Sequence, residues 1–292
     1  MLVVTRYRLT SGTPGLCYSG AVPIPPFTPI PATGDTFIGR QGLVKNLRWR
    51  LARGESLAII GGPKLGKTSL IRTALQGLPQ QAVEIDLAAE QPSRAFNQVR
   101  GSIVVLDNLD VLPDSAMGPL LAHISSARPA ALVATGGHRL RTLLGISGTV
   151  AGVSFRPIPL SVLLDGETRR LIGPSGDPGL AAWSGNHPYL TKLLLHYGKH
   201  AVEDGRGQWE PFVRSLLAAV PHGPELRLLR YLVERGKPVN PAEAHAETGI
   251  DDIKTVADTL VYLGVISRWI RDEEATLFAG CRLLNDALGT RA

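Results

Sequence analysis

The sequence predicts an α/β protein whose parallel sheet is covered by helices on both faces, and three observations support this fold class. Four short runs rich in apolar residues, 56–60, 82–87, 102–106 and 130–134, each predict a strand, and most of them are apolar throughout. Segments with apolar residues at helical spacing separate the runs, and this alternation is typical of a parallel sheet buried on both faces. A glycine-rich segment, residues 61–68, joins the first of these strands to the helix that follows it.

Composition narrows the class of protein. The chain has 292 residues, of which 44% are hydrophobic and 19% charged, so it holds too much apolar material for a disordered protein. No run of about 18 apolar residues occurs, which predicts no membrane span. Arg6 and Arg8 stand where a signal peptide would place its apolar run, so we do not expect the protein to be exported. Cys17 and Cys281 lie at opposite ends of the chain and suggest neither a metal site nor a disulfide framework, so we expect a cytoplasmic protein.

The elements divide the chain into four predicted regions. Residues 1–35, an arm or linker, hold a strand-like run at 2–9 and then a proline-rich stretch. Residues 36–158 form the sheet domain, with helices expected at 42–53, 68–78, 119–127 and 139–144 and a last strand at 152–155. Residues 159–220 are expected to form a helical lid, with helices at 161–172, 179–183, 188–204 and 209–220.

The last region, residues 221–292, predicts a winged helix-turn-helix. Helices are expected at 225–235, 241–247 and 251–263, the third of them capped by Asp251. Two alternating runs, 265–269 and 275–279, surround an acidic turn and predict a hairpin. Helix, short helix, turn, helix and hairpin is the order of elements in a winged helix.

The glycine-rich segment fits the phosphate loop of a P-loop NTPase in both sequence and context. Glycines allow phosphate oxygens to approach the main chain, and the helix that follows provides N–H groups for an anion. The alternative is a glycine-rich turn that contains Gly-Lys-Thr by chance. We expect the loop to bind ATP or ADP with Mg²⁺, Lys67 to reach the β- and γ-phosphates, and Thr68 to ligate the cation. The expected binding residues are Gly61, Gly62, Pro63, Lys64, Leu65, Gly66, Lys67, Thr68 and Ser69.

The strand at 102–106 ends in a carboxylate, Asp107, which we expect to hold Mg²⁺ directly or through water. The alternative is an aspartate that caps the following turn. Hydrolytic enzymes of this type usually carry a glutamate at the next position, where this chain has Asn108, and an amide cannot accept a proton from water. Asp110 could serve in its place. Asp107 and Asp110 are therefore the candidate catalytic residues, and we expect hydrolysis to be slow.

Four short segments together resemble the STAND class of AAA+-related ATPases, signal-transduction switches that include prokaryotic relatives of NOD-like receptors and archaeal ATPases. They are Phe37-Ile38-Gly39-Arg40, Asp107-Asn108-Leu109-Asp110, Ala134-Thr135-Gly136-Gly137 and Gly185-Asn186-His187-Pro188-Tyr189-Leu190. The resemblance spans about residues 37–280. It implies that Ile38, Gly39 and Arg40 line the adenine and ribose side of the pocket, that Thr135 is a sensor beside the γ-phosphate, and that Pro188 packs on the base.

The resemblance also implies a function, that of an ATP-dependent switch in which lid and winged helix control conformation or assembly. STAND proteins carry effector and sensor regions in addition to these domains, so we expect a protein partner or self-association. The alternative is a DNA-associated AAA+ ATPase of the origin-recognition or loader type, which shares the same order of domains.

The distribution of charge bears on that alternative. The chain carries a net charge of +6, but residues 221–292 hold nine basic and eleven acidic residues, a net charge of −2. Aspartates on a recognition helix would repel phosphate, so DNA is disfavoured as a partner. Residues 1–55 hold seven basic and two acidic residues, which predicts either a solvated helix face or a surface for an acidic partner.

Overall fold

The computed structural model describes residues 31–88, 99–145, 147–174, 176–271 and 274–289. The predicted strand at 2–9, Cys17 and most of the predicted arm lie outside these ranges. The described chain divides into two compact units, one formed by residues 31–61 and 67–160 and the other by residues 62–66 and those from 161 onward. No helix within these ranges is long and apolar enough to cross a bilayer.

A five-stranded parallel sheet forms the centre of the first unit and confirms the predicted fold class. Its strands follow the order β2-β3-β4-β1-β7. The strands are β1 (Leu57–Ile60), β2 (Ala82–Asp86), β3 (Ile103–Asp107), β4 (Ala131–Gly136) and β7 (Arg156–Pro159). Every residue of β1, β3 and β4 is buried, as expected for strands covered on both faces.

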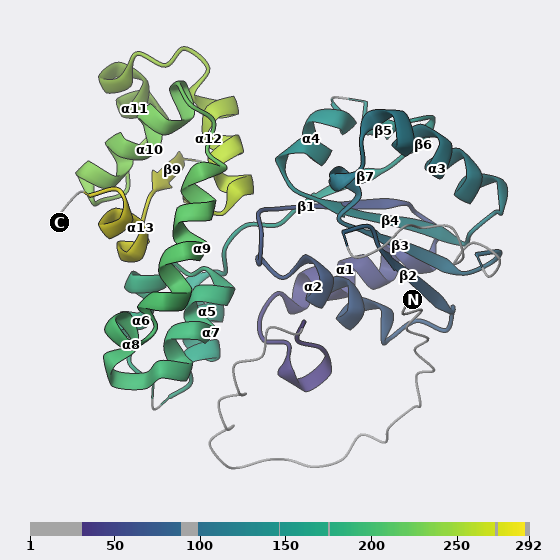
Figure 1. The fold of residues 1–292 in the computed structure, drawn as a ribbon, viewed down its shortest axis with the longest axis horizontal. Coiled ribbons are helices and arrows are strands. Elements are labelled where there is room, and N and C mark those ends of the chain that lie inside the picture. Colours follow the sequence, from purple (N-terminus) through teal and green to yellow (C-terminus); the bar gives the residue numbers. More distant parts are fainter. Residues whose placement is uncertain (1–30, 89–98, 146, 175, 272–273, 290–292) are drawn as a thin grey trace. The chain divides into compact units, whose positions relative to one another are not determined.

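Helices cover both faces of this sheet (Figure 1). The helical segments of this unit are η1 (Gly34–Thr36), α1 (Gln41–Ala52), α2 (Lys67–Leu75), η3 (Leu109–Val111), α3 (Asp114–Ser126) and α4 (His138–Leu144). Figure 1 shows α1 and α2 on one face and α3 and α4 on the other. Right-handed crossovers explain why α2 lies opposite α3 and α4, because the chain moves across the sheet in one direction from β1 to β2 and in the opposite direction afterwards.

Two predictions for this unit were wrong. Residues 152–155 are not a strand of the main sheet, because β6 (Val153–Ser154) pairs only with β5 (Thr149–Val150) in a small hairpin. The fifth strand of the sheet is β7, whose sequence Arg-Pro-Ile-Pro shows no strand pattern. Proline is tolerated there because β7 lies at the edge of the sheet. The second error is the start of α3, which begins at Asp114 and contains Pro119 in its interior.

The second unit is helical except for one hairpin. Its elements are α5 (Asp165–Ile172), α6 (Gly179–Ser184), α7 (Pro188–Tyr197), η4 (Gly198–His200), α8 (Ala201–Asp204), α9 (Arg206–Ala218), α10 (Pro224–Arg235), α11 (Pro241–Thr248), α12 (Ile253–Leu263), β8 (Ser267–Arg271), β9 (Glu274–Phe278) and α13 (Arg282–Ala287). The single helix predicted at 188–204 is interrupted at Gly198, whose φ of 72° does not fit a right-handed helix.

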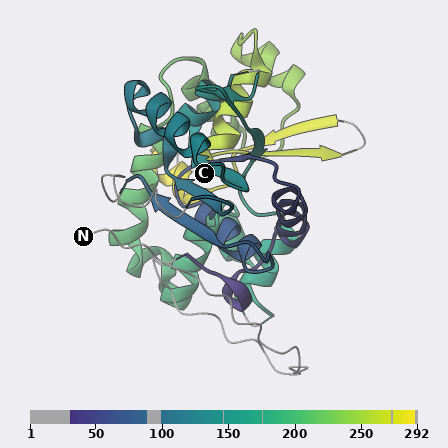
Figure 2. The ribbon, with the colours of Figure 1, turned by 90° about the vertical axis from the view of Figure 1, so that its right-hand side faces the viewer.

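The elements from α10 to β9 follow the order predicted for the last region. Figure 2 shows β8 and β9 as a two-stranded antiparallel ribbon, and an isolated bridge from Val239 to Leu277 extends it on one side. The N-cap of α12 is Asp252 and not Asp251 as predicted. The Asp252 side chain accepts a hydrogen bond from Thr255 N over 3.0 Å.

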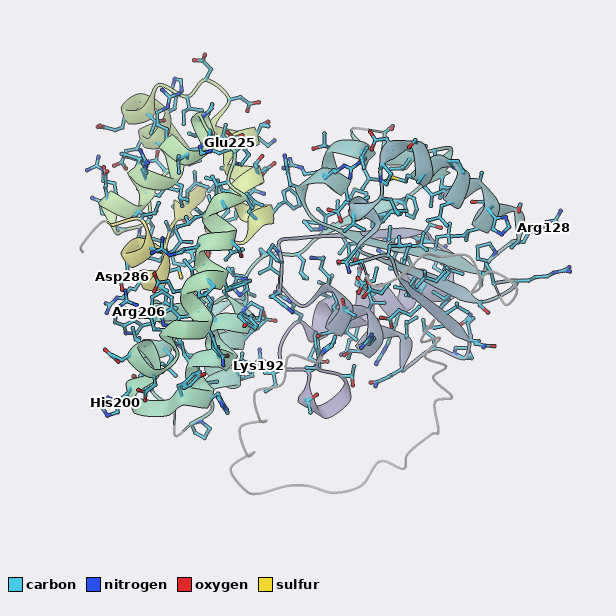
Figure 3. The ribbon with its side chains drawn as sticks, viewed as in Figure 1. Arg128, Lys192, His200, Arg206, Glu225 and Asp286 are labelled. Carbon is cyan, nitrogen blue, oxygen red and sulfur yellow. The ribbon has the colours of Figure 1, made fainter. Side chains whose placement is uncertain are left out.

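One hydrophobic core runs through the second unit, from Ile172 on α5 to Leu284 on α13. The predicted boundary at 158/159 lies close to the boundary between the units. The division at 220/221 stays a prediction, because the core includes residues on both sides of it. Helix α13, which the sequence did not reveal, packs on α6 and α9 and brings Asp286 near Arg206 (Figure 3).

Candidate nucleotide-binding site

The glycine-rich segment forms a loop between β1 and α2, as the sequence predicts. Two of its residues have left-handed backbone conformations, Lys64 with a φ of 57° and Gly66 with a φ of 91°. At the start of the loop Gly61 N donates to Gly136 O on β4 over 3.0 Å. The loop is therefore anchored at one end to the centre of the sheet, and at the other end it leads directly into α2 at Lys67.

Lys67 is held inside the first unit. Its Nζ donates to the carbonyl oxygen of Gly61 over 2.8 Å, across the base of the loop. Burial lowers the pKa of Lys67 from its usual 10.5, and the negative charges of Asp107 and Asp110 act against that shift. The residue is half-buried, and an ammonium group partly removed from water is stabilised by an anion, so Lys67 has the properties expected of a phosphate-binding residue.

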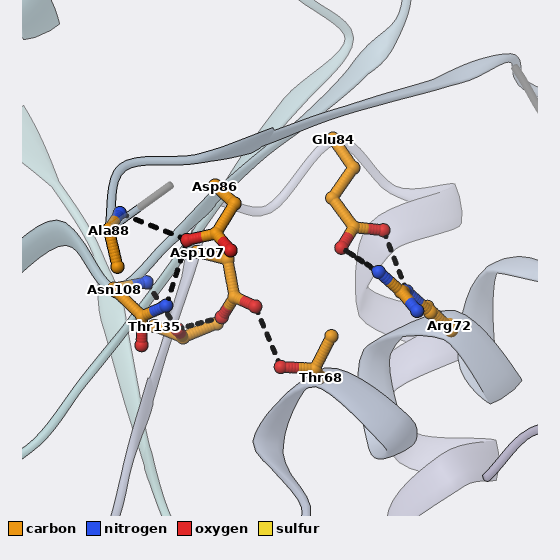
Figure 4. Close-up of polar contacts among 8 residues, drawn as sticks. All are labelled: Thr68, Arg72, Glu84, Asp86, Ala88, Asp107, Asn108 and Thr135. Carbon is orange, nitrogen blue, oxygen red and sulfur yellow. Dashed lines mark hydrogen bonds and ion pairs between the residues drawn. The ribbon is translucent and has the colours of Figure 1, made fainter. Parts of the chain in front are cut away.

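The carboxylate of Asp107 lies at the end of β3 and is only 5% exposed. Two threonine hydroxyls donate to it from opposite sides (Figure 4). Thr68 Oγ1 donates to Asp107 Oδ2 over 2.7 Å, and Thr135 Oγ1 donates to Oδ1. Thr68 is the second residue of α2, and Thr135 belongs to β4. Three elements, α2, β3 and β4, therefore meet at this carboxylate.

Thr135 is fully buried, and its hydroxyl also accepts a hydrogen bond from Asn108 N over 2.9 Å. The structure thus places this predicted sensor residue against Asp107 and Asn108. Its role beside a γ-phosphate stays a prediction.

Asn108 adopts a left-handed conformation with a φ of 60°. Its side-chain Nδ2 donates to Asp86 Oδ1 over 3.0 Å. Asp86 was missed in the sequence, although it ends β2 just as Asp107 ends β3. The missing information was the order of strands, since β2 lies next to β3 and the pairing sets Asp86 beside Asp107.

Asp110 lies in η3 and connects that turn to β4 and α4. Its Oδ2 accepts a hydrogen bond from Gly137 N over 2.6 Å, and its carbonyl accepts one from Arg139 Nη1 over 2.7 Å. A side chain at Gly136 would meet the Asp110 carboxyl group within 2.9 Å, so a glycine is required there. The structure gives Asp110 a connecting role, and its predicted catalytic role stays a prediction.

The remaining predicted site residues lie elsewhere in the two units. Ile38, Gly39 and Arg40 form the bend before α1, where Arg40 is the N-cap with a φ of 54°. Pro188 occupies the first position of α7 in the second unit. His187, just before it, is 2% exposed and packs edge-on against Phe212, with 5.3 Å between the ring centroids. The nucleotide contacts predicted for Ile38, Gly39, Arg40 and Pro188 stay predictions.

The basic side chains of α1 are partly engaged within the first unit. Arg48 donates through Nε to Ala74 O over 3.1 Å and through Nη2 to Thr73 O over 2.9 Å, at the C-terminal end of α2. Arg50 pairs with Glu55 over 2.7 Å. The predicted basic surface is therefore smaller than the sequence suggests.

The chemistry of the site fits a nucleotide with a divalent cation. The hydroxyl of Thr68 and the carboxylate of Asp107 supply adjacent hard oxygen ligands of the kind that Mg²⁺ prefers. Lys67, the residue before Thr68, supplies a half-buried positive charge. Among the described residues no group of three or more His, Cys, Asp or Glu side chains could hold a metal ion. Phosphate oxygens would therefore have to supply part of the coordination shell.

Of the comparisons with known proteins, the one with solved structures agrees with this fold. No protein-family model matches the chain, and no curated protein matches its sequence. Among solved structures, a Walker-type ATPase of Pyrococcus abyssi superposes with a TM-score of 0.52 at 14% identity, over 88% of this chain and 97% of that one.

Two other solved structures give lower scores. The Orc1 protein of Aeropyrum pernix, solved in complex with DNA, has a TM-score of 0.48 at 13% identity over 88% of this chain and 93% of its own. A RuvB variant of Thermotoga maritima also has a TM-score of 0.48, at 16% identity over 88% of this chain and 97% of its own. The first unit thus has the fold of a Walker-type P-loop ATPase, on the evidence of its parallel sheet and of the Pyrococcus structure.

Proposed function

We propose that this protein binds ATP with Mg²⁺ and acts as a STAND-like switch whose conformation or assembly depends on the bound nucleotide. The observation that supports binding most directly is the meeting of Thr68 and Asp107 beside the half-buried Lys67. Lys67 would contact the β- and γ-phosphates, and Thr68 and Asp107 would hold the cation. Bound Mg²⁺ would neutralise charge on the phosphates.

Three features support a switch over a rapid enzyme. Asn108 cannot accept a proton from water, which favours slow hydrolysis. Asp107 is fixed by threonines from α2 and β4, so a change at the phosphates is connected directly to the sheet. The elements from α10 to β9 follow the order of a winged helix, which the resemblance associates with controlled closure. ATP and ADP would shift the equilibrium between two arrangements by their different affinities for them.

The test combines binding and size. We expect titration calorimetry to detect Mg²⁺-dependent ATP binding by the full chain and its loss in Lys67→Ala. Lys45→Ala, which removes an exposed lysine of α1, serves as the matched control and should bind normally. Light scattering with ATP, with ADP and without nucleotide then shows whether assembly follows the phosphate. Unchanged binding in a folded Lys67→Ala variant would overturn the proposal.

The alternative function, a DNA-associated ATPase, is less well supported by the charges of the last region. Two of the three aspartates of the α12 segment have structural partners, since Asp252 caps the helix and Asp258 pairs with Arg268 of β8. The Asp258 pair engages one of the arginines that flank the hairpin turn. We expect little binding to duplex DNA at physiological salt, and strong binding that weakens steeply as salt rises would favour the alternative.

A further inference from the structure

The side chain of Asn108 lies against a carboxylate from the neighbouring strand. Asp86 Oδ1 accepts hydrogen bonds from Asn108 Nδ2 and from Ala88 N, each over 3.0 Å (Figure 4). Parallel pairing of β2 with β3 sets Asp86 in register with Asp107. The edge of the sheet therefore carries two neighbouring carboxylates, one buried at Asp107 and one exposed to solvent at Asp86.

Hydrolysis of a phosphoanhydride is accelerated by a group that accepts a proton from the attacking water. The amide of Asn108 cannot do so. Asp107 is engaged through both of its oxygens by Thr68 and Thr135. Asp110 accepts a short main-chain hydrogen bond from Gly137. The hydrogen bonds to Asp86 likewise use one oxygen, Oδ1, so neither of them engages Oδ2. The two residues differ in exposure, since Asp86 is exposed to solvent whereas Asp110 is half-buried with its carboxyl group against Gly136.

We propose that Asp86 is the general base of ATP hydrolysis in this protein and that Asn108 positions it. This inference rests on the proposed nucleotide binding. The oxygen of a water molecule attacks the γ-phosphorus while one of its protons passes to Asp86 Oδ2. The bond between the γ-phosphorus and the bridging oxygen breaks, and its electron pair leaves with ADP. The products are ADP and inorganic phosphate, and Asp86 then releases the proton to solvent.

The arrangement amounts to an exchange of chemical groups across one hydrogen bond. The carboxylate that hydrolytic relatives place directly after the motif aspartate is here on β2, and the amide of Asn108 occupies the position directly after β3. Such an exchange keeps an acid and its hydrogen-bonding partner at the same edge of the sheet. It also moves the acid one strand farther along the sheet from β4, which agrees with slow turnover.

A purely local role for Asp86 has to be separated from this one. An aspartate whose side chain accepts from the N–H two residues later is a common turn feature, and Asp86 makes that contact with Ala88. Asp86→Asn distinguishes the roles, because asparagine has the same shape and can still accept from Ala88 N. It lacks only the group that takes a proton.

The experiment measures ATP affinity and single-turnover hydrolysis in four proteins. We expect Asp86→Asn to bind Mg²⁺-ATP within about twofold of the wild type, and its rate constant for hydrolysis to fall by about 100-fold or more. The exchanged double variant Asp86→Asn/Asn108→Asp should recover most of the rate, because it restores one carboxylate at the same hydrogen bond. Glu84→Gln is the matched control. It removes another carboxylate of β2, the one that pairs with Arg72, and its rate constant for hydrolysis should equal that of the wild type.

Each outcome decides the proposal. Equal rates in Asp86→Asn and the wild type would overturn it, and so would wild-type protein that binds ATP without any hydrolysis. A loss in Asp86→Asn that the double variant does not restore would reduce Asp86 to a positioning residue. If Asp86→Asn does not fold, the double variant still tests the inference, since it keeps a carboxylate and an amide in contact. Absence of ATP binding in the wild type would instead refute the proposed function itself.

Discussion

Individual residues of the site are held by contacts that connect different parts of the first unit. Thr135 is the clearest case, because its one hydroxyl donates to Asp107 and accepts from Asn108 N. The sequence predicts a polar residue at this strand end but not these partners. Asp107 ends β3 and Asn108 directly follows it, and only the adjacency of β3 and β4 brings them within reach.

Thr135→Val tests whether this residue orders the site. Valine has nearly the same shape but leaves the Asn108 N–H and one Asp107 oxygen without their partner. We expect the free energy of unfolding to fall by about 1–3 kcal/mol. We also expect the gain in ATP affinity on adding Mg²⁺ to shrink. Chemical denaturation and calorimetry with and without Mg²⁺ check both effects, and Thr135→Ser should restore them in part. Full stability in the valine variant would contradict the described role.

The environment of Lys67 predicts a pH dependence for nucleotide binding. Burial lowers its pKa in the free protein, and a phosphate anion would raise it again because the ammonium group is then paired. The affinity for ATP should therefore be highest at pH values below the lowered pKa of Lys67, and it should decrease as the pH rises through that pKa toward 10.5.

Calorimetry over a series of pH values up to 10.5, in buffers of different ionisation enthalpy, should accordingly detect uptake of up to about one proton on ATP binding at pH values between the pKa of the free and of the bound protein. In Lys67→Arg the guanidinium stays charged throughout this range, so any remaining binding should show no such uptake. Identical proton uptake in the two proteins would assign it to another group.

At the scale of elements, whether the sequence predicts a strand or a helix depends on the interactions that form it. Strands β1, β3 and β4 are fully buried, so their apolar runs identify them without further information. Strand β7 could not be found in this way, because its two prolines oppose strand formation and its place is set by pairing with β1. Helix α13 is short, and its packing on α6 and α9 is a tertiary effect. The phosphate loop and Asp107 follow from local sequence, whereas the contact of Asp86 with Asn108 depends on the strand order.

Arg48 of α1 donates hydrogen bonds to the end of α2, and we expect this contact to stabilise the folded protein. Arg48 donates to the carbonyl oxygens of Thr73 and Ala74 near the end of α2, and Ala74 O also accepts from Gly77 N. Arg48→Ala should lower the free energy of unfolding by about 1–3 kcal/mol, because both carbonyls lose a charged donor. Denaturant titration measures the change, with Lys45→Ala on the same helix as control. An effect of Arg48→Ala no larger than that of the control would contradict this account.

At the scale of the whole molecule, each of the two units has buried residues enough for a core of its own. We therefore expect scanning calorimetry to resolve two transitions. ATP at 100 times its dissociation constant should stabilise one of them by about 2.7 kcal/mol, the one that belongs to the unit holding Lys67, Thr68 and Asp107.

Lys67→Ala should remove this shift and leave the transitions themselves in place. A single transition, or an equal displacement of both by ATP, would show that the two units unfold as one.

The prolines of β7 limit how molecules of this protein can associate. Arg156 N and Leu160 N both donate to the β1 side of the strand, at Ser56 O and Ile60 O. Since backbone groups alternate along a strand, the nitrogens at positions 157 and 159 face the outer side, and both belong to proline. That side offers no N–H group to an incoming strand, which protects the sheet from growing by edge-to-edge addition. Any assembly that follows ATP binding must therefore be built from side-chain surfaces and not from extension of the sheet past β7.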